Sequence, residues 1–129
     1  MTPNTHPRID ADLVGAPVTL GDGTAAARLV TSPVMAADDR GLVHGGFVFG
    51  LCDYAAMLAV NDPNVVLGSA EVRFTAPVVV GEVVDAFATR VEVKGRKHRV
   101  DVRAQVGERV VLEGTLTTFV LDRHVLDGR

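Results

Sequence analysis

Residues 42–61 read LVHGGFVFGLCDYAAMLAVN, and this stretch predicts a loop that carries His-Gly-Gly and then a helix of about four turns from near Gly46 to Asn61. Its apolar residues cover every side of the helix, which is typical of a helix buried in a core. Asp53 is the only residue between Gly46 and Asn61 that is expected to carry a charge at neutral pH. Because a buried carboxylate without a partner is costly, Asp53 is the first candidate for a functional residue.

Extended segments flank the predicted helix on both sides. The expected strands are residues 14–20, 25–31, 65–74, 83–94, 98–106 and 109–121. In most of them apolar and polar residues alternate with a period of two, which predicts an antiparallel sheet with one buried and one wetter face. The order of two strands, one helix and four strands predicts an α+β fold, in which a curved antiparallel sheet wraps one long central helix.

The alternation also predicts which residues share a face of the sheet. In residues 65–74 the apolar face carries Ala70, Val72 and Phe74, and the polar face carries Ser69, Glu71 and Arg73. In residues 83–94 the apolar face carries Val83, Phe87, Val91 and Val93. We expect the apolar faces to lie against the helix.

The residues Gly21-Asp22-Gly23 lie between the first two extended segments and predict a hairpin turn. The letters GDGTAA from Gly21 also approach a dinucleotide-binding fingerprint, which requires a helix after the glycines. The chain instead becomes β-branched over residues 29–31 and reaches a proline at Pro33, so we favour the hairpin.

The composition fits a single domain that we expect to be cytoplasmic. The chain has 129 residues, of which 47% are hydrophobic, so it is long enough to bury a core. One cysteine excludes an intramolecular disulfide, and no apolar run reaches the length of a membrane span. A net charge of -3 gives no reason to expect nucleic acid or an anionic membrane as a partner. We expect a flexible segment at residues 1–13, one domain at 14–121 and a tail at 122–129.

Several motifs accompany the predicted helix. Asp53 follows His44 of the His-Gly-Gly motif by nine residues, and VRFTAP from Val72, Gly81-Glu82, KGR from Lys94 and LEGT from Leu112 lie downstream. With these motifs the chain resembles the hotdog-fold acyl-CoA thioesterases of the phenylacetate-pathway (PaaI-like) type and the wider 4-hydroxybenzoyl-CoA thioesterase superfamily. The resemblance extends from about Val14 to Leu121. It implies a hotdog fold, hydrolysis of an acyl-CoA thioester to a free acid and coenzyme A, no cofactor, and a homodimer or homotetramer.

The resemblance also implies roles for individual residues. The backbone N–H of Gly45 would polarise the thioester carbonyl, and Asp53 from the helix of the partner subunit would act as nucleophile or general base. The residue types suit these roles, because glycines at a helix N-terminus offer bare N–H groups and the positive end of the helix dipole. Gly46, the next residue, is expected to contact the substrate as well. A carboxylate in an apolar shell has a raised pKa, which suits a base near neutral pH. The alternative is that Asp53 is structural, as a cap or in an ion pair across a dimer interface.

His44 and Cys52 are further candidates beside these residues. His44 either donates a hydrogen bond to the substrate carbonyl or braces the loop through its ring nitrogens, and we favour bracing because Gly45 already provides a donor. Cys52 adjoins Asp53, but successive residues of a helix point about 100° apart. We therefore interpret Cys52 as a small core residue, not as a nucleophile or a metal ligand, and we expect no metal site.

Asp38 departs from the pattern of the family that the chain resembles, whose members commonly carry Asn or Gln six residues before the histidine. If Asp38 enters the site, two carboxylates would raise each other's pKa, and one of them would donate a hydrogen bond as the amide does. Alternatively, a loop shift of one residue leaves Asp38 and Asp39 in solvent. Both interpretations stay open at this point.

The turn at residues 94–99 is the densest positive cluster of the chain. Lys94, Arg96 and Lys97 would bind the phosphates of coenzyme A through charge-assisted hydrogen bonds. Arg73 is a second candidate for such a contact. The alternative is that the turn is simply solvated, as most charged hairpin tips are.

A non-catalytic hotdog protein that binds acyl-CoA or another ligand is the alternative to a thioesterase. Asp53 distinguishes the two functions, because a pure binder has no need for a buried carboxylate that faces a thioester. We therefore favour catalysis.

Overall fold

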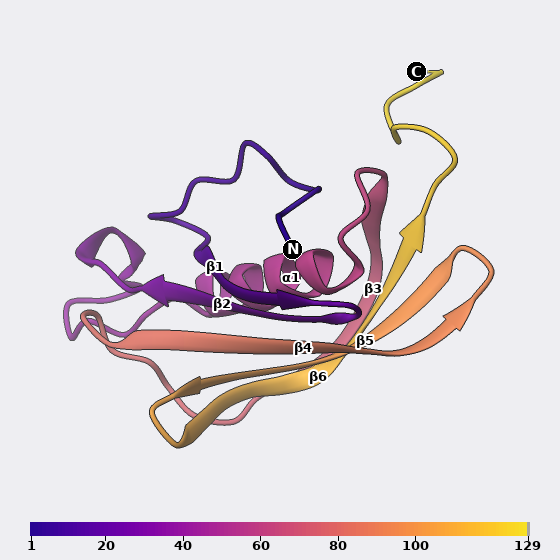
Figure 1. Cartoon of the computed structure of the whole chain (residues 1–129). Coiled ribbons are helices and arrows are strands. Elements are labelled where there is room, and N and C mark those ends of the chain that lie inside the picture. The colour runs from indigo at the N-terminus through magenta and orange to yellow at the C-terminus, as the bar shows by residue number, and fades with distance from the viewer. Residues whose placement is uncertain (129) are drawn as a thin grey trace.

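A computed structural model describes residues 1–128 and shows one central helix packed against a six-stranded antiparallel sheet (Figure 1). The strands are β1 (Ala16–Gly21), β2 (Thr24–Val30), β3 (Val65–Phe74), β4 (Val83–Lys94), β5 (Lys97–Val106) and β6 (Arg109–Val120). The helices are the short 3-10 helix η1 (Pro33–Met35) and α1 (Gly45–Val60). In space the strands follow the order β1-β2-β4-β5-β6-β3. The α+β architecture that the order of the elements predicts is confirmed.

The turn between β1 and β2 is a hairpin, as predicted. Gly21 pairs with Thr24, and Gly23 has a φ of 77°, a left-handed conformation that glycine adopts without steric cost. Because a strand and not a helix follows these glycines, the turn lacks the geometry of a dinucleotide-binding fingerprint.

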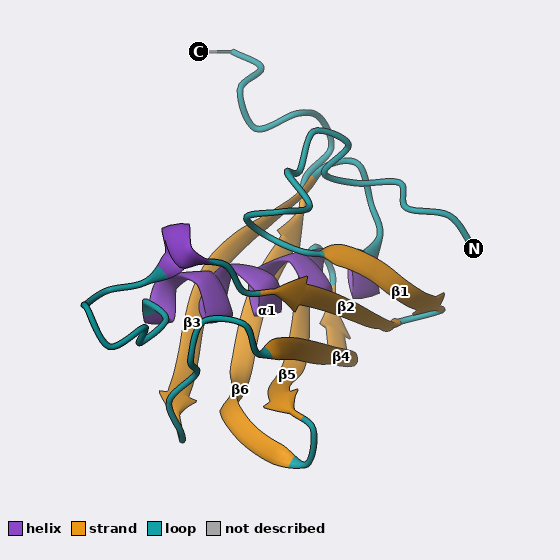
Figure 2. Cartoon of the chain, turned by 90° about the vertical axis from the view of Figure 1, so that its left-hand side faces the viewer, coloured by secondary structure: helices purple, strands orange, loops and turns teal. Residues whose placement is uncertain are grey.

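The sheet is curved, and α1 packs against its concave face (Figure 2). The fully buried residues of the helix include Leu51, Cys52, Ala55 and Leu58, and they pack with Leu29 of β2, Val84 of β4, Val100 of β5 and Leu116 of β6 in one hydrophobic core. Asn61 ends the helix in a left-handed conformation with a φ of 54°, and Pro63 follows two residues later. Since proline cannot continue a helix, the predicted helix end is confirmed.

The predicted inner face of β4 is wrong. The residues of β4 that lie against the core are Val84, Ala86 and Ala88, whereas Val83, Phe87, Val91 and Val93 are exposed. The helix contacts β4 more than any other strand, and small alanine side chains let the helix backbone approach the sheet closely. The larger apolar side chains of β4 therefore point to the outer side of the sheet.

The strand β3 forms one edge of the sheet, because it pairs with β6 and with no other strand of the described residues. Its predicted apolar face is only partly covered in the single chain: Val72 is half-buried, Ala70 is exposed, and Phe74 is 56% exposed. An exposed edge of 10 residues is an open template for pairing with another strand.

The N-terminal segment lies beside α1 (Figure 1). The side-chain Nδ2 of Asn61 donates to the backbone oxygen of Thr2 over 3.0 Å, and its Oδ1 accepts from the N–H of Asn4 over 2.7 Å. Thr5 is buried, and Ile9 packs against the core. These contacts tie residues that the sequence suggests are flexible to the end of the helix. Within residues 1–128, no helix combines the length and the apolarity that crossing a membrane requires.

Candidate active site

Asp53 lies in the middle of α1 and is half-buried, whereas its neighbours Leu51, Cys52 and Tyr54 are buried. A helix turns by about 100° per residue, so Asp53 lies within about 20° of Gly46 and roughly opposite the fully buried Leu51. Gly50, one turn before Asp53, is on the same side, and a Cβ atom added there would meet no atom within 4 Å. Open space in the single chain therefore lies beside Gly50, one turn from Asp53.

The carboxyl group of Asp53 has few interactions that would stabilise its negative charge. Among residues 1–128, its Oδ1 atom is buried and forms no hydrogen bond. Burial raises the pKa of Asp53 to about 6, because desolvation penalises the charged form. A carboxyl group with this pKa is mostly ionised at neutral pH and still basic enough to accept a proton from water.

Gly45 is the first residue of α1 and lies about two turns before Asp53. His44 is the N-cap, with an extended backbone and no side-chain hydrogen bond to the helix. The first amides of a helix have no intrahelical acceptor, and no acceptor for the Gly45 N–H is found within residues 1–128. This N–H group is therefore available to a ligand, at the positive end of the helix dipole.

A pocket of about 390 Å³ adjoins Gly45. It is lined by Val43, Gly45, Val48, Phe74, Thr75, Ala76, Pro77, Val78 and Val111. Part of the pocket wall is formed where the loop before α1 contacts the loop before β4. The Val43 N–H donates to the Val78 oxygen over 2.8 Å, and Leu42 forms a β-bridge with Val79. The sequence interpretation missed this pocket, although the VRFTAP motif that carries Phe74 and Pro77 was one of the signals for the family.

The distance between Gly45 and Asp53 decides whether both residues of one chain can act on the same carbonyl group. They are separated by eight residues of one helix, which corresponds to a rise of about 12 Å at 1.5 Å per residue. An oxyanion donor must lie within about 3 Å of the carbonyl oxygen, and the acting carboxylate must reach the carbonyl carbon directly or through one water. One chain therefore does not bring the Gly45 N–H and the Asp53 carboxylate to the same carbonyl.

His44 and Gly46 lie at the helix entrance beside Gly45. The His44 ring is exposed and packs edge-on against Phe47, with 6.3 Å between the ring centroids. A Cβ atom at Gly46 would stand 3.1 Å from Cδ2 of this ring, so the ring covers Gly46. The backbone N–H of His44 donates to the Met35 oxygen over 2.9 Å, which anchors the loop to η1.

Asp38 lies on the exposed loop before the helix. Its Oδ1 atom accepts hydrogen bonds from the backbone N–H groups of Arg40 over 2.9 Å and of Leu42 over 3.2 Å. The carboxylate therefore closes the loop that leads to His44. Asp39, the next residue, is exposed.

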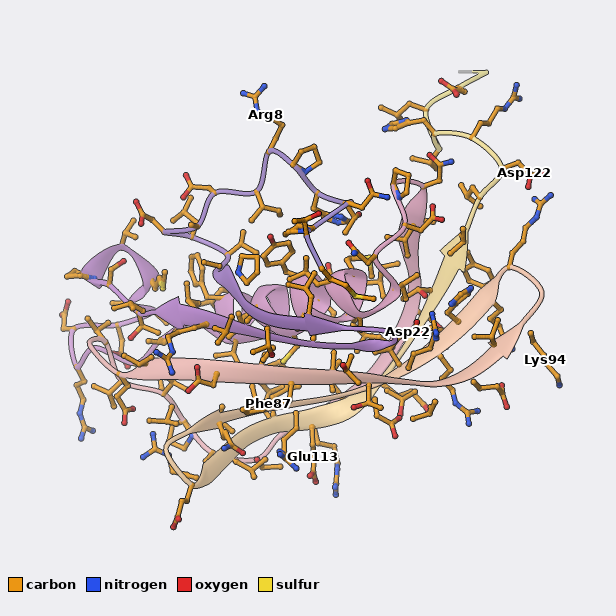
Figure 3. All side chains as sticks on the ribbon, in the orientation of Figure 1. Arg8, Asp22, Phe87, Lys94, Glu113 and Asp122 are labelled. Carbon is orange, nitrogen blue, oxygen red and sulfur yellow. The ribbon has the colours of Figure 1, made fainter. Side chains whose placement is uncertain are left out.

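The predicted phosphate-binding cations lie away from Gly45 in the single chain. Lys94, Arg96 and Lys97 form the turn between β4 and β5, and Figure 3 shows Lys94 at that end of the sheet. Arg96 forms an ion pair with Asp122. The loop before α1 adjoins the other end of β4, where the Thr31 N–H donates to the Glu82 oxygen. A strand of 12 residues separates the two ends, about 40 Å at 3.3 Å per residue.

Arg73 is on the outer side of the sheet and pairs with Glu113 of β6. Figure 3 shows Glu113 projecting from this outer side. Cys52 is fully buried, and burial together with the charge of Asp53 raises its thiol pKa to about 12. The interpretation of Cys52 as a core residue is confirmed. The described residues contain no group of three or more His, Cys, Asp or Glu side chains that would hold a metal ion.

Comparisons with known proteins bear on the family of the chain. The family model of the fluoroacetyl-CoA-specific thioesterase (FlK) matches residues 56–124, more than half of the chain. A curated relative, methylthioribose-1-phosphate isomerase of Aquifex aeolicus (strain VF5), is 49% identical over 119 residues. That match covers 92% of this chain and 26% of the isomerase, so the chain spans about a quarter of the length of that relative.

Solved structures share the whole fold. The uncharacterized protein PH1136 from Pyrococcus horikoshii is 51% identical with a TM-score of 0.97, and the match covers 98% of both chains. A mutant of the phenylacetic acid degradation protein PaaI from Thermus thermophilus is 28% identical with a TM-score of 0.78, over 84% of this chain and 95% of that one. A hypothetical thioesterase from Streptococcus pneumoniae TIGR4, solved with coenzyme A, is 20% identical over 88% and 91% of the chains with a TM-score of 0.78, which shows a common fold alone.

Proposed function

The chain belongs to the hotdog-fold thioesterase superfamily, and from this premise we propose that it hydrolyses an acyl-CoA thioester to a free acid and coenzyme A. The family includes acyl-CoA thioesterases, as the description of the fluoroacetyl-CoA-specific model states. The observation that carries the proposal is the carboxyl group of Asp53, whose buried Oδ1 has no hydrogen-bond partner in the described chain. Nothing in the packing of the single chain accounts for an acid at this position.

The proposed reaction uses two groups at the thioester. The Gly45 N–H, at the positive end of α1, donates to the carbonyl oxygen as negative charge develops there. Asp53 either takes a proton from the attacking water or attacks the carbonyl carbon itself. In the first route hydroxide adds to the carbon, the tetrahedral intermediate expels the coenzyme A thiolate, and the proton held by Asp53 passes to that thiolate. In the second route the Asp53 carboxylate adds to the carbon and the tetrahedral intermediate expels the thiolate. Water then cleaves the remaining acyl-aspartyl anhydride, which releases the acid and regenerates Asp53.

A second copy of the chain completes this site in the proposal. Since Gly45 and Asp53 of one helix lie about 12 Å apart, a two-fold axis beside α1 would set Asp53 of the partner subunit against Gly45 of the first. The unpaired edge of β3 supports this pairing, because two such edges would join the sheets of both copies. We therefore propose a homodimer as the active unit, alone or paired into a homotetramer.

The remaining residues would position the substrate. Gly46 follows Gly45 and would offer a second bare N–H, while His44 and Asp38 hold the loop that carries these amides. Lys94, Arg96 and Lys97 lie far from Gly45 in one chain, so a contact with the coenzyme A phosphates requires that a second chain contribute the turn. Arg73 already forms an ion pair with Glu113, so it is a weaker candidate for a contact with the phosphates.

A panel of acyl-CoA substrates tests the proposal. Purified protein should release free thiol from at least one of a short-chain, a long-chain and an aryl acyl-CoA. The variant Asp53→Asn should lower kcat/KM by at least about 100-fold. Asp85→Asn is the matched control, because Asp85 is an acid on the outer side of β4 that pairs only with the exposed Arg28 among the described residues, so its loss should leave kcat/KM unchanged. Full activity of Asp53→Asn would disprove the assigned role of Asp53, and no turnover across the panel would favour a non-catalytic binder.

A further inference from the structure

The pocket at Gly45 has a definite chemical character. Its side chains are apolar apart from Thr75, whose hydroxyl already donates to the Val110 oxygen over 2.8 Å. None of its lining residues is charged. A buried carboxylate or ammonium group would therefore meet no ionic partner there, whereas an uncharged apolar group would displace water from apolar surface.

Phe74 is one of the large apolar residues that the fold of the single chain leaves exposed. It is the last residue of β3, and its side chain is 56% exposed although it is among the largest apolar side chains of the chain. A Cβ atom at Gly45 would stand 3.2 Å from Cε1 of its ring, so the ring lies directly beside the amide that we assign to the oxyanion. The ring contributes little to the core and forms the part of the pocket wall that lies beside Gly45.

We propose that Phe74 is a specificity-determining residue, and that the pocket it closes receives the acyl group, which is uncharged, apolar and compact. The inference rests on the proposed function, since it places the thioester carbonyl at the Gly45 N–H. The ring sets the width of the pocket beside the reacting carbon. A pocket of about 390 Å³ accommodates a ring or a short branched chain, and the absence of a cation among its lining residues disfavours acyl groups that end in a carboxylate.

Two other cavities fit a substrate less well. The cavity of about 950 Å³ on the outer side of the sheet is lined by charged side chains, of which Arg73 and Glu113 pair with each other. The cavity of about 580 Å³ beside His6 and His124 lies between the N-terminal segment and the tail, and it contains neither Gly45 nor Asp53. Neither brings an apolar pocket to a free helix amide.

Binding of thioether analogues of acyl-CoA tests the inference without requiring turnover, because the thioether bond is not hydrolysed. Dissociation constants would be measured by titration calorimetry for analogues with an ethyl group, a phenylethyl group, a dodecyl group and a carboxyethyl group. The wild-type protein should bind the phenylethyl analogue at least about 10-fold more tightly than the carboxyethyl analogue. Phe74→Ala should shift the ratio of the dodecyl to the phenylethyl constants by at least about 10-fold in favour of dodecyl, and Phe74→Trp should shift it the other way.

Phe87→Ala is the matched control. Phe87 is an exposed phenylalanine on the outer side of β4, where the guanidinium of Arg103 lies 5.6 Å from its ring centroid (Figure 3). Its removal should leave all four dissociation constants unchanged. Thermal unfolding would verify that each variant is folded. Ratios that stay within about 2-fold of wild type in both Phe74 variants would overturn the inference, as would no binding of any analogue. If the Phe74 ratios shift but no acyl-CoA is hydrolysed, the inference stands and the proposed function falls.

Discussion

At the scale of single residues, the pKa of Asp53 makes a prediction about pH. Burial raises this pKa to about 6, and the proposed base or nucleophile is the ionised form. The value of kcat/KM should therefore be nearly constant above pH 7 and fall about 10-fold per pH unit well below pH 6. A pH–rate profile of the wild-type protein, with circular dichroism to verify folding at each pH, measures this dependence.

Two variants separate Asp53 from other titrating groups. The residual rate of Asp53→Asn should lose the step near pH 6, whereas His44→Gln should keep it, because His44 is not the proposed base. A step that disappears in His44→Gln and persists in Asp53→Asn would assign the titration to the histidine and contradict the proposal.

The proposed role of the Gly45 N–H can be tested by a substitution that removes this donor. Gly45 is the first residue of α1, a position where proline is well tolerated, and His44 before it already has the extended backbone that precedes a proline. Gly45→Pro removes the N–H donor, so kcat should fall by about 100-fold to 1,000-fold.

Gly45→Ala is the control for this variant, because it adds a similar Cβ atom beside Phe74 but keeps the N–H. It should retain most of the activity, since the ring of Phe74 is exposed and free to move by a few tenths of an ångström. Equal losses in Gly45→Pro and Gly45→Ala would show that space and not the hydrogen bond matters at this position.

At the scale of the helix, Gly50 predicts what lies against α1. A Cβ atom there meets nothing within 4 Å of the single chain, and glycine in a helix interior costs about 0.5–1 kcal/mol relative to alanine. Glycine at this position is explained if a second copy approaches the helix closely. We expect Gly50→Leu to preserve thermal stability of the folded chain while weakening dimer formation and lowering turnover at least about 10-fold.

Gly50→Ala is a milder variant of the same position, and it should weaken dimer formation and lower turnover less than Gly50→Leu does. Sedimentation at several protein concentrations together with the thiol-release assay measures the effect. Unchanged association and turnover in Gly50→Leu would mean that this side of α1 faces solvent in the active protein.

The helix and the strands differ in how much of their structure the sequence predicts. The apolar run of α1, the turn at Asp22-Gly23 and the period-two strands are local patterns, so the helix, the hairpin and the strands were predictable. The inner face of β4 was not, because two alternating sets of residues are both apolar and only the approach of α1 decides between Val84 and Phe87. The pocket at Gly45 likewise depends on contact between two loops, such as the bridge of Leu42 with Val79, which no local pattern encodes.

At the scale of the whole molecule, two observations on the single chain point to the same partner. Within the described residues, β3 has a strand partner on one side only, so its other edge is open along 10 residues, and the pocket residue Phe74 lies exposed at the end of that edge. Independently, Gly45 and Asp53 are too far apart along one helix to share a carbonyl. The proposed pairing of two copies would account for both, and it would make the active site a property of the dimer.

A mixing experiment tests whether the site is shared between copies. Gly45→Pro and Asp53→Asn would each be nearly inactive alone, but a mixed dimer would contain one site with an intact Gly45 N–H from one chain and an intact Asp53 from the other. With random association half of the dimers are mixed and each has one working site, so co-expressed variants should regain about a quarter of wild-type activity. Differently tagged chains, purified through both tags, would enrich the mixed dimer and raise the recovery toward about half. If the purified mixed dimer stays as inactive as its parents, Gly45 and Asp53 must come from the same chain, and the two-fold arrangement proposed here is wrong.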